Sequence, residues 1–376
     1  MNIILPSLPA LSDYFNTDYA LVQLTLSAYL AMTAVLQLIT GPLSDRYGRR
    51  PVILGSLTIF IVATLVTTMA TSFEMFLTAR LLQAAIVTGY TLSRAMVRDM
   101  VPMHQAASMI GYVTMGMALV PMIGPGLGGL LEENYGWQSI YYLMSALGLI
   151  TLIVVWFDQS ETNQNRSTSF TAQFRSYPEL LRSRRFWGYA FSVMFASGSY
   201  FAFLGGAPYV AENYFGLTPA IVGSYFASLA IGYIIGNFFS GRYAGKIGIA
   251  KMMLIGTIVT AIGIAIAIAA ALAGASHAAS FFFPLISVGL GNGLTLPSAN
   301  AGLVSVRPHL AGSASGLGGA IMIGGGAALS VFAGIVLTPT SGPAPLLWLM
   351  EISALFSIAA TLYTNRIERT FVKHEA

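Results

Sequence analysis

Gly41-Pro42-Leu43-Ser44-Asp45-Arg46-Tyr47-Gly48-Arg49-Arg50-Pro51 is the stretch that decides the fold. It stands between two long apolar runs, 19–42 and 52–70. Its glycines allow a very short turn and close backbone approach, and Asp45 can pair with the arginines of its own loop. The stretch therefore predicts two long helices joined by a tight basic turn.

The composition of the whole chain agrees with a membrane protein. Of the 376 residues, 56% are hydrophobic and only 9% are charged, against roughly 25% charged residues in an ordinary soluble domain. This balance argues against a soluble enzyme, a disordered chain and a nucleic-acid binder. The sequence has no cysteine, so we expect no disulfide framework.

Long apolar runs recur along the chain, each of about 20 residues, the length that crosses a bilayer as one helix. Residues 1–11 resemble the second half of one more helix, whose first half, roughly 15–30 residues, we expect to lie upstream. We predict an all-α integral membrane protein with eleven full spans and a truncated first span. The eleven runs cover 19–42, 52–70, 73–96, 105–131, 138–157, 186–210, 218–240, 250–273, 279–304, 311–337 and 344–364.

Charge assigns the two sides of the membrane. With the truncated helix counted as span 1, 17 of the 18 basic residues fall in one set of loops and in the C-terminal tail. Because loops rich in Lys and Arg stay in the cytoplasm, both termini of the complete chain are predicted to be cytoplasmic. The opposite loops carry no basic residue and hold Asp13, Asp18, Glu74, Glu132, Glu133 and Glu212.

The polar stretch 158–185 divides the chain into a first helix bundle, 1–157, and a second bundle with a short cytoplasmic tail, 186–376. An internal repeat supports two related halves, because the basic turn 41–48 is matched by a similar turn 200 residues later, at 241–248. Two six-helix halves with repeated loops are an arrangement that secondary transporters use.

Arg80 is the one basic residue that lies deep inside a span rather than at a span end or in a loop. It lies about two turns from the start of its helix, where a charge costs at least ~2.5 kcal/mol. A guanidinium there can change the proton affinity of nearby carboxylates as a cavity opens and closes. The alternative is a structural arginine that caps backbone carbonyls.

Three motifs resemble those of the major facilitator superfamily. The turn 41–51 is similar to the superfamily's loop signature, which latches the two halves on the cytoplasmic side. Residues 77–83 resemble its arginine motif of span 4, associated with proton coupling, although Ala84 stands where a glycine often follows. Residues 124–129, Gly-Pro-Gly-Leu-Gly-Gly, resemble the antiporter motif of span 5.

Further strings resemble the bicyclomycin/chloramphenicol resistance (Bcr/CflA) branch of drug:proton antiporters, from Met1 to about residue 365. They include 5–9, 23–29, 98–99, 136–137 and 203–209. The resemblance implies the twelve-span fold, the bacterial inner membrane and drug export driven by protons, with the proton as coupling ion and no cofactor. Many members carry an aspartate where this chain has Asn2, which cannot carry a proton.

The predicted site residues fall into three groups. Glu351 is assigned to the proton-coupling group because it is a carboxyl about seven residues inside the last span. The alternative is that Glu351 has no part in the mechanism. Proton coupling or gating is assigned to Asp45, Arg46, Arg49, Arg80, Arg98, Asp99 and Glu351. The antiporter motif comprises Gly116, Pro121, Gly124, Pro125, Gly128 and Gly129. The substrate cavity is assigned to Gln23, Tyr29, Tyr90, Tyr112, Met115, Tyr200, Phe203, Tyr225, Asn292, Asn300 and Met322.

The function predicted is proton-coupled multidrug efflux of small amphipathic or antimicrobial compounds by alternating access, by a monomer. The four histidines have no metal-ligand spacing and no catalytic motif is visible, so neither a metal site nor an enzyme is expected. One alternative is a proton-coupled exporter of a metabolite such as a sugar or amino acid. A second alternative is a different class of membrane protein, an intramembrane enzyme or a signalling receptor. A third is that this chain is inactive because half of its first helix is missing.

Overall fold

The computed structural model describes residues 2–100, 124–163, 172–307, 310–338 and 341–375, and this part of the chain is helical, without a strand. Within it, ten helices are long and apolar enough to cross a membrane. They match ten of the eleven predicted full spans, so the all-α membrane fold is confirmed. The remaining run, 105–131, lies mostly outside the described residues.

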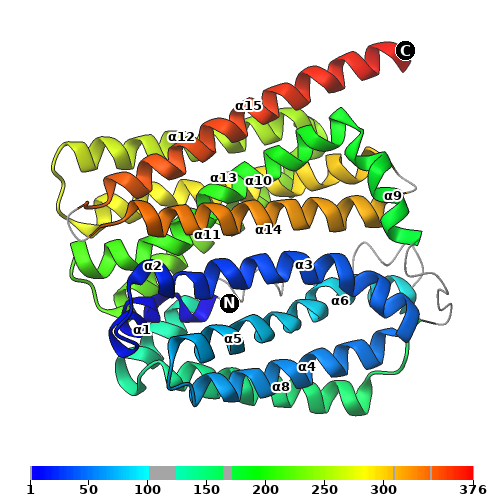
Figure 1. Cartoon of the computed structure of the whole chain (residues 1–376). Helices are drawn as coiled ribbons and strands as arrows, with labels where there is room; N and C mark the ends of the chain where they lie inside the picture. The colour runs from blue at the N-terminus through cyan, green and yellow to red at the C-terminus, as the bar shows by residue number, and fades with distance from the viewer. Residues whose placement is uncertain (1, 101–123, 164–171, 308–309, 339–340, 376) are drawn as a thin grey trace.

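The first half begins with short helices and continues in long ones (Figure 1). The predicted span 73–96 is not one continuous α-helix, because a 3₁₀ turn, η2, interrupts it directly after Gln83. Mid-helix 3₁₀ turns often mark functional positions. The elements are η1 (Asn2–Ser7), α1 (Leu8–Tyr14), α2 (Tyr19–Val22), α3 (Leu24–Tyr47), α4 (Arg49–Thr68), α5 (Phe73–Gln83), η2 (Ala84–Ile86), α6 (Val87–Met100), a helix over 124–135, and α8 (Gln138–Asp158).

The second half follows the polar stretch 158–185, which itself contains a helix, α9, packed against α14. Pro208 lies near the end of α10, which continues into a π-helical turn, η3, whereas Pro297 lies within an unbroken α13. The elements are α9 (Ala172–Leu181), α10 (Arg184–Tyr209), η3 (Val210–Tyr214), α11 (Pro219–Ile247), α12 (Ile249–Leu272), α13 (Ala278–Ser305), α14 (Ala311–Val336) and α15 (Ala344–Glu375).

The repeated basic turns have the same backbone form. Gly48 alone separates α3 from α4, with φ +102°, and Gly248 alone separates α11 from α12, with φ +90°. A side chain at either position would be strained. The internal repeat of the sequence is therefore a repeat of structure as well.

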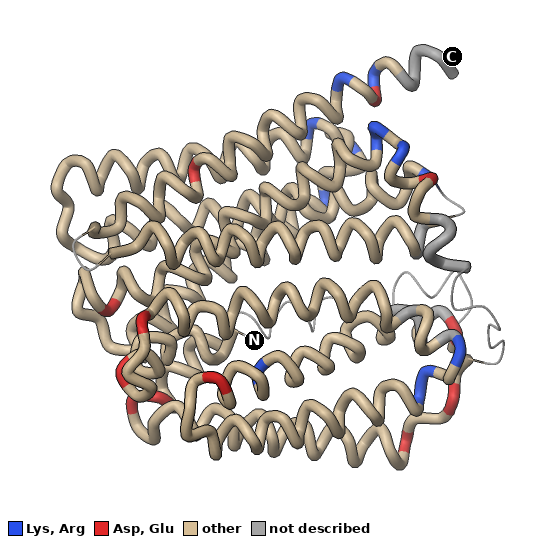
Figure 2. Tube along the Cα trace, in the orientation of Figure 1, with Lys and Arg blue, Asp and Glu red and all other residues tan. Residues whose placement is uncertain are grey.

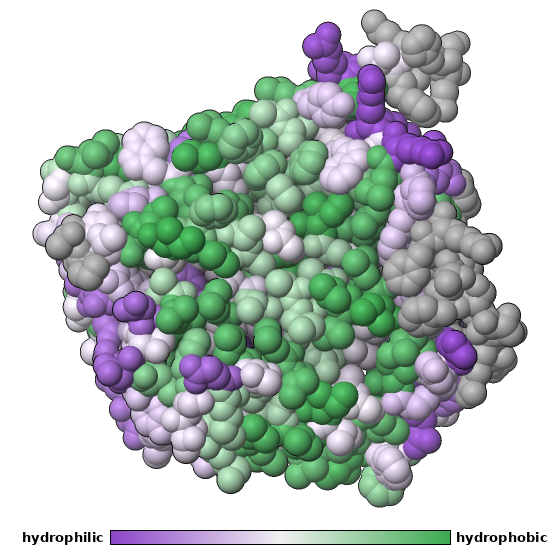
Figure 3. Space-filling model, in the orientation of Figure 1, coloured by the Kyte–Doolittle hydropathy of each residue, from purple (hydrophilic) through white to green (hydrophobic). Residues whose placement is uncertain are grey.

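Charges and apolar surface have the distribution of a membrane protein. Figure 2 shows Asp and Glu without Lys or Arg at the end of the molecule that holds α1, and nearly all Lys and Arg, together with further Asp and Glu, at the opposite end. We call these the acidic end and the basic end. Between them the visible surface in Figure 3 is predominantly hydrophobic. Such a belt suits a hydrocarbon environment.

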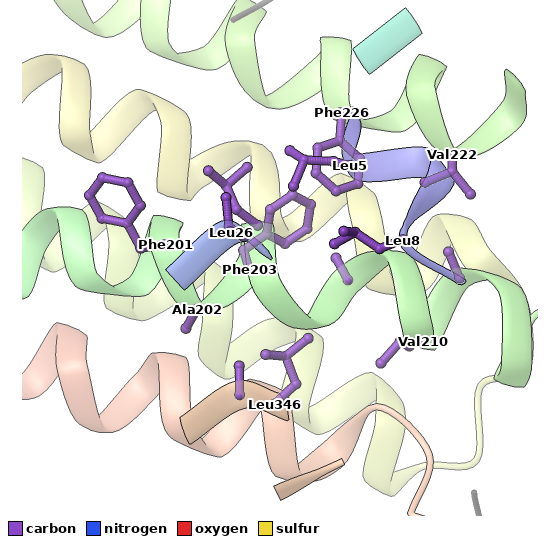
Figure 4. Packing of buried hydrophobic residues seen from close by; sticks show 14 of the residues in the cluster. Leu5, Leu8, Leu26, Phe201, Ala202, Phe203, Val210, Val222, Phe226 and Leu346 are labelled. Carbon is purple, nitrogen blue, oxygen red and sulfur yellow. The ribbon is translucent and has the colours of Figure 1, made fainter. Parts of the chain in front are cut away.

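A hydrophobic core joins the two halves. Leu5, Leu8 and Leu26 of the first half lie in one buried cluster with Phe203 and Phe226 of the second (Figure 4). The rings of Phe203 and Phe226 are 4.8 Å apart between centroids. Because these residues come from η1, α1 and the start of α3, the shared core lies toward the acidic end.

Candidate functional site

Arg80 is buried in the first half, on α5, with 1% of its surface exposed. Its guanidinium carbon lies 4.7 Å from the ring centroid of Tyr29 and 6.0 Å from that of Tyr141. A guanidinium over aromatic faces is held by cation–π attraction, which strengthens where water is excluded. Among the described residues no carboxylate forms an ion pair with Arg80, and the aromatic rings are part of what stabilises its charge.

A short hydrogen-bond chain fixes one edge of this guanidinium. Nη1 of Arg80 donates to Oε1 of Gln83 over 2.6 Å, and Nε2 of Gln83 donates to the hydroxyl of Thr67 over 2.8 Å. All three side chains are buried. Nε and Nη2 of Arg80 are buried and have no hydrogen-bond partner in the described part of the chain. Two donor nitrogens of this permanently charged side chain can therefore bind a further acceptor.

The signature turn is tied to its own half and to the linker. Arg49 pairs with Asp99 at the end of α6, with Nε 3.2 Å from Oδ2, and it also donates to the hydroxyl of Ser44. The backbone N–H groups of Arg49 and Arg50 donate to the carboxylate of Glu161 over 2.9 and 3.2 Å. A carboxylate at a helix N-terminus is favourable, so Glu161 stabilises the start of α4.

Polar contacts seal the two halves against each other toward the acidic end. The hydroxyl of Tyr19 donates to the carbonyl of Gly205 over 2.9 Å, and the amide of Gln23 donates to the carbonyl of Ser330. The rings of Tyr19 and Tyr209 also lie 4.6 Å apart. These contacts join α2 and the start of α3 to the C-terminal parts of α10 and α14.

Glycines of the antiporter motif form a second part of this seal. A Cβ on Gly129 would overlap the carbonyl group of Pro219, at the start of α11 in the other half. A Cβ on Gly223 would likewise overlap the carbonyl of Pro125, whereas one on Gly128 would overlap the carbonyl of Ile3, within the same half. Small residues let helices approach this closely. The helix over 124–135 thus packs backbone to backbone on α11.

Comparison with known proteins agrees with this architecture. The sequence profile described as Major Facilitator Superfamily matches residues 1–331. The chain belongs to the major facilitator superfamily. Members of this family and the relatives below are transporters, so the chain is a multi-pass membrane transporter and not an enzyme.

Two relatives of this facilitator are named for drug resistance. A chloramphenicol resistance protein of Pseudomonas aeruginosa is 30% identical over 329 residues, which are 86% of this chain and 78% of that protein. A bicyclomycin resistance protein homolog of Haemophilus influenzae is 25% identical over 369 residues, 96% of this chain and 91% of that protein. Both names agree with the Bcr/CflA branch indicated by the sequence motifs.

A solved structure shares the fold of this facilitator. The crystal structure of a D-xylose-proton symporter aligns with a TM-score of 0.77 at 13% identity, over 96% of this chain and 92% of the other. At this identity the similarity concerns the fold alone. It confirms the predicted major facilitator architecture.

The residues predicted to line the substrate cavity of the facilitator occupy different environments. Gln23 is part of the seal, Tyr29 lies on Arg80, and Phe203 is fully buried in the core shared by the halves. Tyr225 stacks on Phe282, with centroids 4.3 Å apart. Asn292 is buried, with Oδ1 free of described partners, and Met322 packs beside a second core cluster. Tyr90 and Asn300 are exposed.

Asn2 and Tyr200 connect the halves deeper in the molecule. Nδ2 of Asn2 donates to the hydroxyl of Tyr200 on α10 over 3.2 Å. Asn2 is the position where many members of the branch carry an aspartate. Glu351, the other predicted carboxyl, lies buried on α15, and its Oε2 has no described hydrogen-bond partner.

Some predicted residues fall outside the description. Tyr112, Met115, Gly116 and Pro121 belong to the undescribed stretch 101–123, and the side chains of Asp45 and Arg98 are not described. Arg46 is exposed beside Tyr47, with its guanidinium carbon 5.5 Å from the ring centroid. The assigned roles of all these residues stay predictions.

The sequence reasoning missed several residues that the structure brings into the site. Tyr141 and Thr67, which complete the environment of Arg80, lie on α8 and α4 and carry no motif. Tyr19, Gly205 and Ser330 of the seal were missed as well. The sequence does not distinguish buried Tyr141 from its exposed neighbour Tyr142.

Proposed function

We propose that this facilitator exports small amphipathic compounds, antimicrobials among them, in exchange for protons. The observation that carries the proposal is Arg80, a buried cation that has no carboxylate partner among the described residues and two donor nitrogens without a described acceptor. Support also comes from the relatives named for chloramphenicol and bicyclomycin resistance.

In the proposed mechanism, the positive charge of Arg80 acts electrostatically on acidic groups that come near it. A guanidinium keeps its own proton at any physiological pH, so the transported proton travels on another group. When a protonated carboxyl group of the protein or of the substrate approaches Arg80, the positive charge favours its ionised form, so it releases its proton more readily there. The resulting carboxylate can accept hydrogen bonds from the Arg80 nitrogens that have no described acceptor. A proton moving down 100 mV supplies ~2.3 kcal/mol, enough for about a 50-fold substrate gradient.

The proposed orientation places the basic end in the cytoplasm, as the distribution of Lys and Arg indicates. The seal at the acidic end then closes the periplasmic side. Cysteines introduced at the exposed residues Glu133 and Arg182 test this in intact cells. An impermeant thiol reagent is expected to label only the first, and labelling of both from outside contradicts the orientation.

Transport in inverted vesicles tests the function. Acidifying the vesicle interior is expected to drive uptake of a fluorescent amphipathic dye, and collapsing the pH gradient is expected to release it. Arg80→Ala removes the buried cation and is expected to abolish gradient-driven uptake, while Arg80→Lys retains a part. Normal pumping by Arg80→Ala contradicts the coupling role.

The same vesicles separate the proposal from the metabolite alternative. The preparation is challenged with chloramphenicol and with labelled sugars and amino acids, and competition with the dye is measured. Competition by chloramphenicol alone supports drug export. Gradient-driven movement of a sugar or amino acid, without any of the drug or dye, overturns it.

A further inference from the structure

The last helix is longer than a membrane span. α15 runs for 32 residues, Ala344–Glu375, whereas about 20 residues cross the hydrocarbon core. Its first 20 residues reach about position 364, so the turns that follow extend beyond the core at the basic end. Figure 1 shows α15 leaving the bundle there, toward the C-terminus. Asn365 to Thr370 therefore lie at the depth of lipid headgroups.

A cavity of about 290 Å³ opens at this level between α12 and α15. Its lining is ordered by polarity: Leu254 and Leu362 lie on the side of the hydrocarbon core, and the polar residues follow along α15 toward the basic end. The full lining is Leu254, Leu362, Asn365, Arg366, Arg369 and Thr370. Apolar residues at one side and guanidinium groups at the other match an acyl chain and its phosphate.

The two arginines are available for an anion. Arg366 and Arg369 are exposed, and in the described part of the chain neither guanidinium has an ion pair or hydrogen bond. The nearest carboxylate in sequence, Glu368, is bound by Arg185 and by the hydroxyl of Tyr189 on α10, each 2.9 Å away. Within the described part of the chain, no carboxylate thus neutralises the charge of the pair.

The opposite wall of the cavity adds to the positive potential. α12 begins at Ile249, so its first backbone N–H groups and helix dipole point toward the basic end. Exposed Lys251 lies one turn before Leu254. Asn365 joins the walls, because its Nδ2 donates to the carbonyl of Ala250 over 3.3 Å, and its buried Oδ1 has no described donor. That oxygen can accept a headgroup hydroxyl.

We propose that this cavity binds an anionic phospholipid, with its phosphate between Arg366 and Arg369 and an acyl chain along Leu362 and Leu254. The site lies on the outside of the second half, away from the seal between the halves. It is independent of the exported compound and of Arg80, so it can fail or hold regardless of the proposed function.

Native mass spectrometry of the full chain tests this site. The protein is purified in neutral detergent and titrated with phosphatidylglycerol, and in parallel with phosphatidylcholine. We expect retention of one phosphatidylglycerol molecule and none of phosphatidylcholine. Arg366→Gln/Arg369→Gln is expected to weaken binding about 30-fold, which corresponds to about 2 kcal/mol for two basic residues.

A matched control removes the same charge elsewhere at the basic end. Arg182 and Arg184 are exposed and have no described ion pair, so Arg182→Gln/Arg184→Gln is expected to bind the lipid as the unmodified protein does. Thr370→Glu keeps both arginines and places a carboxylate in the cavity. It is expected to weaken binding even if the double arginine variant does not fold.

Three results would overturn the proposal. The first is equal loss of binding in the control and the arginine variant, which means that overall charge attracts the lipid. The second is retention of phosphatidylcholine as strong as that of phosphatidylglycerol. The third is displacement of the lipid by inorganic phosphate at similar concentration, which means a site for the free anion.

Discussion

Arg80 shows how single residues can be placed by physical reasoning from sequence. A lone arginine inside an apolar run has to be buried among groups that tolerate its charge, and the structure confirms its burial. The sequence did not predict which groups these are. Tyr141 lies 61 positions further along the chain, on α8, and the two residues come together because α5 and α8 both pack against α4.

Thr67 is predicted to position this arginine through Gln83. Thr67→Val keeps the shape of the side chain but leaves a buried amide donor unsatisfied, which costs about 1–3 kcal/mol. We expect a lower melting temperature and weaker gradient-driven dye transport. The neighbouring Thr68 is only half-buried and its hydroxyl donates to the carbonyl of Leu65 in its own helix, so Thr68→Val is the control. Equal behaviour of the two variants would contradict the positioning role.

Glu132 is predicted to make stability depend on pH. Burial raises the pKa of this carboxyl, and its Oε2 has no described hydrogen-bond partner. The folded protein therefore holds the proton more tightly than the unfolded chain. The stability this provides is complete below the unfolded pKa and is lost as pH rises through the folded pKa.

Melting curves at several pH values check this sign. Glu132→Gln is expected to match the unmodified protein in acid and to melt at a higher temperature in neutral and alkaline buffer. Glu133 is exposed, so Glu133→Gln is expected to leave the pH dependence unchanged. A Glu132→Gln variant that melts lower than the unmodified protein at alkaline pH would show that the charged carboxylate is stabilising.

At the scale of elements, helix positions were predictable and their irregularities were not. Apolar length and charge located the spans, because crossing a bilayer demands about 20 apolar residues. The 3₁₀ turn after Gln83, the π turn after Tyr209 and helix α9 inside the polar stretch were not predicted. They depend on local packing, for which hydropathy carries no signal.

The close approach of the helix over 124–135 to α11 gives a prediction at this scale. Gly129→Ala places a methyl group on the carbonyl of Pro219, and overpacking of this kind costs about 1–3 kcal/mol. We expect a lower melting temperature and a weakened seal at the acidic end. Gly55 on α4 has no atom near the position of a Cβ. Gly55→Ala should therefore be neutral or slightly stabilising, and an equal loss in both variants would reject the contact.

For the whole molecule, the sequence predicts two related halves, and the turns at Gly48 and Gly248 share one backbone form. Which end of the molecule is sealed could not be predicted. That depends on contacts between residues far apart in sequence, such as Gln23 with Ser330 and Tyr19 with Gly205. In an alternating transporter these contacts have to break for the other state to form.

The central claim is that the two halves move so that the acidic end is closed in one state and the basic end is closed in the other. Because the chain has no cysteine, spin labels can be attached to pairs of introduced cysteines without background. One pair, Tyr14 and Tyr214, lies at the acidic end, and the other, Tyr47 and Ile247, at the basic end. All four side chains are exposed.

Pulsed electron–electron distance measurements on both pairs, with and without the transported dye and across pH, test this claim most directly. The account predicts a short distance for the pair 14/214 at rest, and a second state in which this distance lengthens while that of 47/247 shortens. Distances that stay fixed in a protein that transports, or that lengthen together, would contradict it.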